Sequence, residues 1–142
     1  MQWACLALLA ASPAAGGVAP FIVDGDAIEA PLAGLAGDRH RGEAVVKNRE
    51  TANCLICHAI PDPTERFMGD VGPSLAGVGA RLSSAQIRLR LVDPTLLNAR
   101  AIMPAYHRLE GLTRVDERYR GRPVLSAQEI EDVVAYLSAL EN

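Results

Sequence analysis

The chain reads Cys54-Leu55-Ile56-Cys57-His58 in its first half, a Cys-x-x-Cys-His run. This spacing is typical of the covalent attachment of a c-type haem. Two thiols three positions apart on a helical turn can each bond one vinyl group of the same porphyrin, and the histidine that follows can ligate the iron. The run therefore predicts one covalently bound c-type haem, attached through Cys54 and Cys57, with His58 as an axial metal ligand.

Two other chemistries use paired cysteines. A four-thiolate zinc site needs a second pair, and the only further cysteine is Cys5, inside an apolar N-terminal stretch. A thioredoxin-like redox pair needs a βαβ context, and no alternating strand pattern surrounds Cys54 and Cys57. Both readings are weaker than haem attachment.

Composition is compatible with a cofactor-centred domain. The chain has 142 residues, which favours one domain. Only 4% of the residues are aromatic, so a buried macrocycle would supply apolar volume that the side chains lack. The net charge is −3, and no basic stripe with interleaved aromatics is present, which argues against a nucleic-acid partner.

The N-terminus has the layout of a secretory signal over residues 1–19. Residues 3–11 form an apolar run that is too short to span a bilayer, and small residues follow it. A positive n-region is missing, and a buried N-terminal helix is the alternative. Cleavage within about residues 12–23 would remove Cys5 and leave no stable membrane anchor. Export to the periplasm is expected, since c-type haems are attached outside the bacterial cytoplasm.

Three segments carry the signals of capped helices. Asp38 can cap a helix that runs up to the Cys-x-x-Cys-His run. A capping box begins at Ser83, and its helix must stop near Asp93, because Pro94 disfavours the α conformation in the residue before it. A second capping box begins at Ser126, ahead of a clear apolar stripe. These signals predict three helices of ordinary length.

The remaining segments complete one all-α domain over residues 37–142. Residues 20–36 are rich in Ala, Gly and Pro without a helical period, and are expected to form an extended arm or linker. Glycines and prolines between residues 61 and 79 predict a long loop. No segment requires a β-strand, so the predicted protein is a small bundle of helices folded around a cofactor.

The iron also needs a sixth ligand or an open site, and Met103 is the preferred candidate. Pro104 disfavours a helical Met103, which places the thioether on an extended loop. A thioether is a soft, neutral ligand that stabilises ferrous iron. Met68 is too close in sequence to the proximal histidine and is expected to pack. His107 is expected to be a surface or hydrogen-bonding residue. His40 is expected to be a solvated helix residue.

Gly72-Pro73 is a candidate support for the proximal ligand. The dipeptide follows His58 in the sequence, within the predicted loop. A carbonyl held rigidly there could accept a hydrogen bond from Nδ1 of the imidazole. Such a bond sets the tautomer and the orientation of a metal-bound histidine. Taken alone, Gly-Pro is only a turn. Its place after His58 makes Pro73 a cofactor-binding candidate.

Positive charge is concentrated in residues 81–122, which hold nine arginines against four acidic residues. Arginine is favoured at protein interfaces because its planar fork binds carboxylates in pairs of hydrogen bonds. Two interpretations stay open: a solvated face with structural ion pairs, or a docking surface on the methionine side of the haem. Arg88 and Arg90 are candidate residues for that surface.

These motifs together resemble class I cytochrome c, in which the first and last helices cross where a glycine meets an aromatic residue. Gly42 and Tyr136 match those two positions. A narrower resemblance covers about residues 38–142 and is to the SoxX family, the small monohaem subunits of SoxAX cytochromes. One position departs from it: a second tyrosine is expected after Tyr106, where this chain has His107. The similar stretches are residues 65–67, 72–81, 88–93, 102–106 and 123–137.

The resemblance implies a class I cytochrome c fold, with helices wrapped around one covalently attached haem, and an electron-accepting role. It implies a heterodimer with a SoxA-like subunit that carries the catalytic haem, so this chain would not be catalytic alone. The complex, an L-cysteine S-thiosulfotransferase, would couple thiosulfate to the cysteine of a SoxY-type carrier. The electron would pass to a downstream cytochrome. His58 and Met103 would both ligate the iron.

Two other functions compete with this one. The chain could be a free-standing periplasmic monohaem cytochrome that shuttles electrons to a respiratory oxidase or reductase. It could also be an enzyme or gas sensor with an open haem site. Met103 argues against the open site, since a saturated iron leaves no position for a substrate. The arginine-rich segment favours a fixed partner over a shuttle.

Overall fold

A computed structural model describes residues 16–142, and the predicted signal over residues 1–19, with Cys5, lies almost wholly outside the described residues. Within residues 16–142 no strand forms, and the single isolated β-bridge joins Asp24 and Ala27. The predicted all-α class is confirmed. The helices are α1 (Arg39–Lys47), α2 (Val78–Arg81), α3 (Ser84–Val92) and α4 (Ala127–Ser138), with 3₁₀ turns η1 (Leu32–Gly34), η2 (Cys54–Ile56), η3 (Pro94–Leu96) and η4 (Glu117–Tyr119).

Helix α1 begins where the sequence predicts and ends earlier than predicted. The Asp38 side chain accepts a hydrogen bond from the backbone N–H of Arg41 at 2.8 Å. The helix does not continue to the Cys-x-x-Cys-His run, because the Asn48 side chain accepts from the backbone N–H groups of Glu50 and Thr51. Such local bonds compete with helical ones and form a turn instead.

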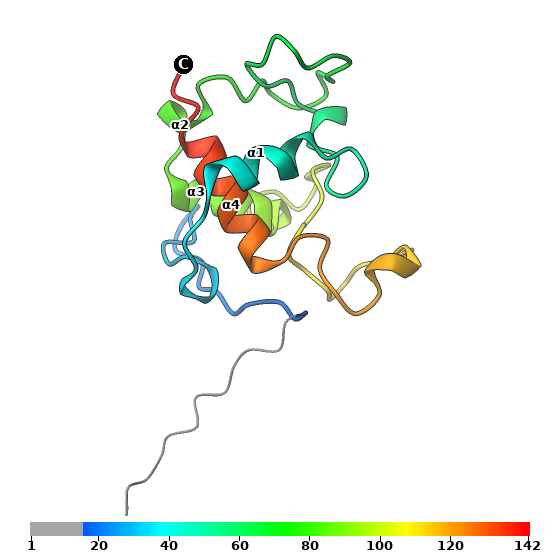
Figure 1. Cartoon of the computed structure of the whole chain (residues 1–142). Coiled ribbons are helices and arrows are strands. Elements are labelled where there is room, and N and C mark those ends of the chain that lie inside the picture. Colours follow the sequence, from blue (N-terminus) through cyan, green and yellow to red (C-terminus); the bar gives the residue numbers. More distant parts are fainter. Residues whose placement is uncertain (1–15) are drawn as a thin grey trace, which may run out of the picture.

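Helices α1 and α4 cross in the centre of the molecule (Figure 1). The crossing is close because residue 42 is glycine. A Cβ atom at Gly42 would overlap the backbone carbonyl of Asp132 and the Cβ of Tyr136. The predicted meeting of Gly42 with Tyr136 is therefore confirmed. Arg41 adds an ion pair to Asp132 at 2.7 Å across the same crossing.

Both predicted capping boxes are present. At the start of α3 the side chains of Ser83 and Gln86 each accept a hydrogen bond from the other residue's backbone N–H, and Ser126 and Glu129 do the same at α4. The apolar stripe of α4 is buried in the core and consists of Ile130, Val133, Val134 and Leu137. These boxes fix the starts of two helices that together contribute about half of the buried apolar residues.

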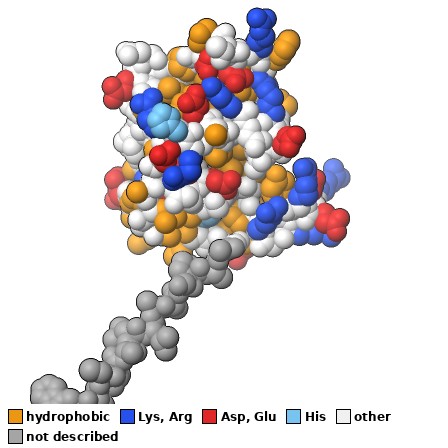
Figure 2. All heavy atoms as spheres, viewed as in Figure 1, with side chains coloured by type: hydrophobic (Ala, Val, Ile, Leu, Met, Phe, Trp, Pro, Cys, Tyr) orange, Lys and Arg blue, Asp and Glu red, His pale blue; other side chains and the backbone are white. Residues whose placement is uncertain are grey.

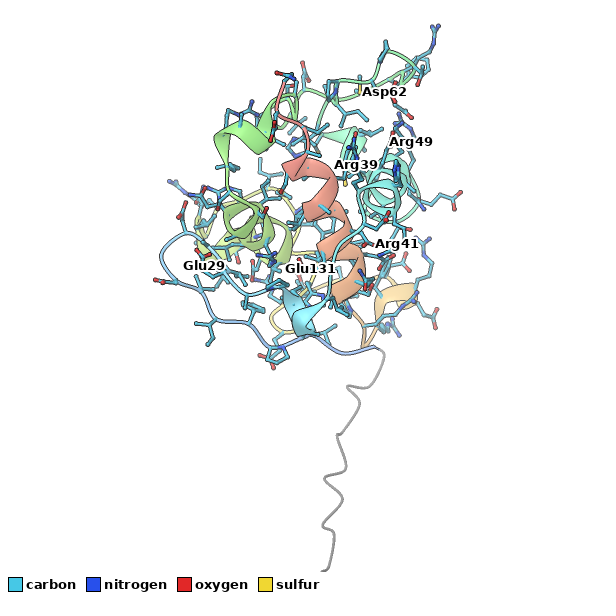
Figure 3. The ribbon with its side chains drawn as sticks, turned by 60° about the vertical axis from the view of Figure 1, so that its left-hand side comes forward. Glu29, Arg39, Arg41, Arg49, Asp62 and Glu131 are labelled. Carbon is cyan, nitrogen blue, oxygen red and sulfur yellow. The ribbon has the colours of Figure 1, made fainter. Side chains whose placement is uncertain are left out.

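Residues 20–36 pack against the domain as an arm rather than leaving it as a linker. Ile28 and Leu32 are fully buried, and the backbone N–H of Leu32 donates to the Glu131 carboxylate at 2.8 Å. Arg88 from α3 pairs with the same carboxylate at 2.7 Å and donates to the Ile28 carbonyl. Figure 3 shows Glu131 on α4 near the centre of the molecule. One buried ion pair thus joins the arm, α3 and α4.

The glycine-rich segment contains a short helix that was expected to be loop. Helix α2 packs on the C-terminal end of the chain, where a Cβ at Gly79 would overlap the Ser138 carbonyl. The backbone N–H groups of Gly77 and Gly79 donate to the carbonyls of Asn142 and Leu140. These tertiary bonds compensate for the low helix propensity of glycine.

Among the described residues, no helix has both the length and the apolar character that a membrane span requires.

Candidate haem-binding site

A cavity of about 520 Å³ lies between the Cys54 segment, the Gly72–Leu75 loop, α3 and α4. Cofactor sites generally occupy about 300–1,000 Å³ and are mostly apolar. Val46, Leu91 and Leu137 give the wall its apolar character from three helices. The cavity lining includes all five predicted cofactor-binding residues: Cys54, Cys57, His58, Pro73 and Met103.

The Cys-x-x-Cys-His run forms a single helical turn, η2. The backbone N–H groups of Cys57 and His58 both donate to the Cys54 carbonyl, at 3.2 and 3.0 Å. Asn53 opens the turn in the left-handed conformation, with φ of 48°. An asparagine tolerates that conformation better than most residues. The turn brings Cys54, Cys57 and His58 to the wall of one cavity.

The environment of Cys54 is unlike that of a redox-active thiol. Burial raises the pKa of the Cys54 thiol to about 11. Reactive cysteine pairs have a lowered thiol pKa, because the thiolate is the nucleophile. No group of three or more His, Cys, Asp or Glu side chains among residues 16–142 is arranged to hold a metal ion. The thioredoxin-like and zinc alternatives therefore have no support in this geometry.

His58 is held from two sides by the loop after it. The distance between its Nδ1 and the carbonyl oxygen of Pro73 is 2.7 Å, which makes Nδ1–H the donor and leaves Nε2 as the free lone pair. Gly72 lies against the ring, since a Cβ there would overlap the imidazole. Gly72 also donates its backbone N–H to the Cys57 carbonyl at 2.7 Å. Pro73 and Gly72 together fix the orientation of the ring.

Arg81 supports the same loop and was not predicted to belong to the site. Its two terminal nitrogens donate to the carbonyls of Ala76 and Ser74, at 2.6 and 2.9 Å. Arg90, on α3, donates to the Gln86 carbonyl and lies 3.7 Å from a carboxylate oxygen of the exposed Asp26. Arg81 and Arg90 are the arginines that line the cavity, which has no carboxylate in its lining.

The structure separates the two methionines considered as ligands. Met103 lies on a non-helical segment and lines the cavity, as the Met103-Pro104 sequence predicts. Met68 does not line it, and its sulfur accepts a hydrogen bond from the Ile60 backbone N–H at 3.3 Å. Met103 is therefore the methionine available to a group in the cavity.

His107 differs from the expected surface residue. It is fully buried, and its two ring nitrogens are both engaged. Nδ1 lies 2.8 Å from the Leu125 carbonyl, and Nε2 accepts from the Ala19 backbone N–H at 3.0 Å. The hydrogen-bonding half of the expectation is correct. The ring does not line the cavity and has no free lone pair, so His107 does not compete with Met103.

The arginine-rich segment divides into structural and surface residues. Arg88 is only 5% exposed and holds Glu131 with two nitrogens, so for this candidate the interpretation as a structural ion pair is correct and the docking role is excluded. Arg108 pairs with Asp93 at 2.8 Å. Arg90 remains half-buried at the cavity. A charge pattern in the sequence could not separate these roles, because burial depends on the tertiary fold.

Three exposed apolar side chains, Ile56, Val71 and Ile102, also line the cavity. Exposed apolar groups around an opening are typical of a ligand or partner site. The cavity is thus an apolar slot whose mouth is apolar too, with cysteines, an oriented imidazole and a thioether on its walls. This fold and site define a class I cytochrome c.

Comparison with known proteins identifies the family. No family model matches the chain, and no curated protein sequence matches it. A solved structure does match: SoxXA from P. pantotrophus, with 32% sequence identity and a TM-score of 0.79, over 86% of this chain and 95% of the matched chain. The chain belongs to the SoxX family.

Proposed function

We propose that this chain is the electron-accepting subunit of a SoxAX-type complex and carries one covalently bound c-type haem. The observation that carries the proposal is the 2.7 Å contact between Nδ1 of His58 and Pro73, in an apolar cavity that Cys54, Cys57 and Met103 also line. A bond of this kind orients an imidazole for metal ligation, and here the oriented ring lines the same cavity as the two thiols and the thioether.

Each residue has a role in this proposal. Cys54 and Cys57 bond the porphyrin, His58 ligates through Nε2, and Met103 supplies the thioether. When bound, the haem takes up and releases one electron. Apolar walls exclude water, and Arg81 and Arg90 offer positive charge to the two propionates. No other thiol lies among residues 16–142, which leaves no cysteine for a reactive haem ligand.

We infer the partners from membership of the SoxX family and not from the geometry of the cavity. A SoxA-like subunit would carry the catalytic haem, and the complex would couple thiosulfate oxidatively to the cysteine of a SoxY-type carrier. This chain would pass an electron to a downstream cytochrome in the periplasm. The apolar mouth of the cavity, around Ile56, Val71 and Ile102, supports a partner that covers it.

Spectroscopy tests the haem site. Denaturation in acid and organic solvent should leave the haem on the polypeptide. Oxidised protein should show a sulfur-to-iron charge-transfer band that Met103→Ala abolishes, with a lower reduction potential. Axial ligands move haem potentials over roughly 0.8 V, so the loss should be easily measured. The matched control is Met68→Leu, which should keep the band. Free extraction of haem, or a band lost only in Met68→Leu, would reject the site.

Reconstitution tests the partnership. The isolated chain should be reducible yet unable to join thiosulfate to a SoxY-type cysteine. With a SoxA-like subunit, conjugation should appear and the haem of this chain should be reduced during turnover. Turnover by the isolated chain would contradict its assignment as a subunit that needs a SoxA-like partner. Two independent monomers on gel filtration at micromolar concentration would favour a free-standing electron shuttle instead.

A further inference from the structure

A second cavity, of about 480 Å³, lies behind the methionine segment. Its other wall is the excursion between residues 112 and 124, which projects from the domain in Figure 1. Ile102, Met103 and Pro104 line both this cavity and the haem cavity. Figure 2 shows basic side chains gathered over the projecting segment. We call this second space the arginine cavity.

The arginine cavity carries uncompensated positive charge. Arg108, Arg114 and Arg122 line it, and Asp116 is the one carboxylate in its lining. Asp116 already holds Arg118, at 3.1 Å. Arg108 is matched by its ion pair with an aspartate outside the lining. Among residues 16–142, Arg114 and Arg122 make no ion pair, so two positive charges remain unmatched at one cavity.

Both unmatched arginines are exposed, and the side chain of Arg122 is held in place. Arg122 donates from Nε to the Arg118 carbonyl at 2.6 Å and stacks on Tyr119, with its guanidinium 5.6 Å from the ring centroid. Arg118 lies over the same ring at 5.7 Å. Arg114 has a left-handed backbone, with φ of 56°. A non-glycine residue in that conformation is uncommon and persists where its surroundings impose it, often at binding sites.

The geometry points to an anion site: the arginine cavity binds a small tetrahedral oxyanion with two negative charges, held by Arg114 and Arg122. Planar guanidinium groups match such oxygens with paired, charge-assisted hydrogen bonds. Arg122 binds Arg118 through Nε, so its two terminal nitrogens are free for this purpose. Thr113 adds a hydroxyl to the lining. The inference does not depend on the electron-transfer role, since it uses no haem chemistry.

Calorimetric titration of the purified, haem-loaded protein tests the site. Sulfate, thiosulfate and phosphate would each be added at constant ionic strength, with chloride as the monovalent comparison. At least one dianion should bind saturably at one site, and chloride should not. Arg114→Gln and Arg122→Gln should each weaken binding about tenfold, since each removes a charge-assisted pair of hydrogen bonds. The matched control is Arg120→Gln, an exposed arginine of the same segment outside the lining, which should change binding less than about twofold.

The outcomes separate clearly. Tighter binding of thiosulfate than of sulfate would assign the site to reduced sulfur anions, and equal binding would assign it to divalent oxyanions in general. Heats that never saturate, or an equal loss in Arg120→Gln, would reduce the effect to ionic screening and overturn the proposal. Loss of partner binding in Arg114→Gln without any anion binding would also overturn it, by making these arginines a protein-docking surface.

Discussion

Gly72 lies against the imidazole of His58, so closely that a Cβ at position 72 would overlap three ring atoms. We predict that Gly72→Ala tilts the ring and weakens its bond to the Pro73 carbonyl. Overpacking of this kind costs about 1–3 kcal/mol. The change should appear in the optical spectrum of the haem-loaded protein as well as in its thermal midpoint. Asp70→Ala, at an exposed position two residues away, should leave the spectrum unaltered; equal spectra for the two variants would remove the role given to Gly72.

The helix crossing should be equally intolerant of a side chain. Gly42→Ala would drive a methyl group into the Asp132 carbonyl, and backbone cannot yield as a flexible side chain can. The expected loss in the free energy of unfolding is at least about 1–3 kcal/mol, measured by urea denaturation. His40→Ala, on the exposed side of the same helix, should stay within about 0.5 kcal/mol. Similar losses in the two variants would mean that the crossing is not tight.

The buried pair of Arg88 and Glu131 should respond strongly to the loss of one partner. Arg88→Met leaves a carboxylate buried without its cation, which typically costs about 3–5 kcal/mol. Arg90→Met removes a half-exposed arginine from the same helix and should cost less than about 1 kcal/mol.

The double variant Arg88→Met with Glu131→Gln measures the coupling directly. It should be more stable than the sum of the single losses predicts, because neither side chain then leaves a charge unpaired. Recovery should be incomplete, since the Leu32 N–H and the Ile28 carbonyl still lose charged partners. Additive losses would show that the two side chains are not coupled.

His107 should matter to stability and not to the haem. His107→Leu removes the donor to the Leu125 carbonyl, and an unsatisfied buried backbone group costs about 1–3 kcal/mol. His107→Gln keeps a donor and should lose less. The charge-transfer band should survive in both variants, because the ring does not line the haem cavity. A band that disappears with His107→Leu would transfer a ligand role to this residue.

Acid should lower the stability that the protein gains from the Asp62 carboxylate, in the loop after α1. The bond from Lys47 Nζ, at 2.6 Å, and those from Thr64 hold the pKa of the Asp62 carboxyl well below its usual 3.8. A lowered folded-state pKa means that the stabilisation is complete above that usual value and is lost as the pH falls below it. Figure 3 labels Asp62 toward the top of the view.

Urea midpoints measured from pH 7 to pH 2 would reveal this contribution. Asp62→Asn should lower the midpoint at pH 7 and flatten its fall in acid. The control is Asp70→Asn, since Asp70 is exposed and makes no ion pair among residues 16–142. If the urea midpoints of wild type and Asp62→Asn fall in parallel with pH, the titration of Asp62 does not contribute to stability.

Features set by short segments were predictable from the sequence. The capping boxes at Ser83 and Ser126 involve residues three apart, and the turn at Cys54 is equally local. Gly42 was predictable only through resemblance, because its partner Asp132 lies at the other end of the chain.

Other features depend on neighbours that no local pattern reveals. The sequence does not distinguish the roles of Arg81 and Arg88. Arg81 donates to two carbonyls of the loop after His58, whereas Arg88 forms a buried ion pair. His107 read as a surface residue because charged and polar neighbours surround it, and burial became evident only when Leu125 was placed beside it. Helix α2 was missed because tertiary bonds, not propensity, stabilise it.

Helix α4 contacts three segments that lie far from it in the sequence. It binds the arm through a hydrogen bond that spans 99 residues, the Asp38 cap region through one that spans 94, and α3 through an ion pair that spans 43. Contacts so distant in sequence form late and slow folding. The chain therefore cannot assemble its core while it is being synthesised, and a protein truncated before residue 127 should remain a collapsed, unfolded chain rather than a smaller folded domain.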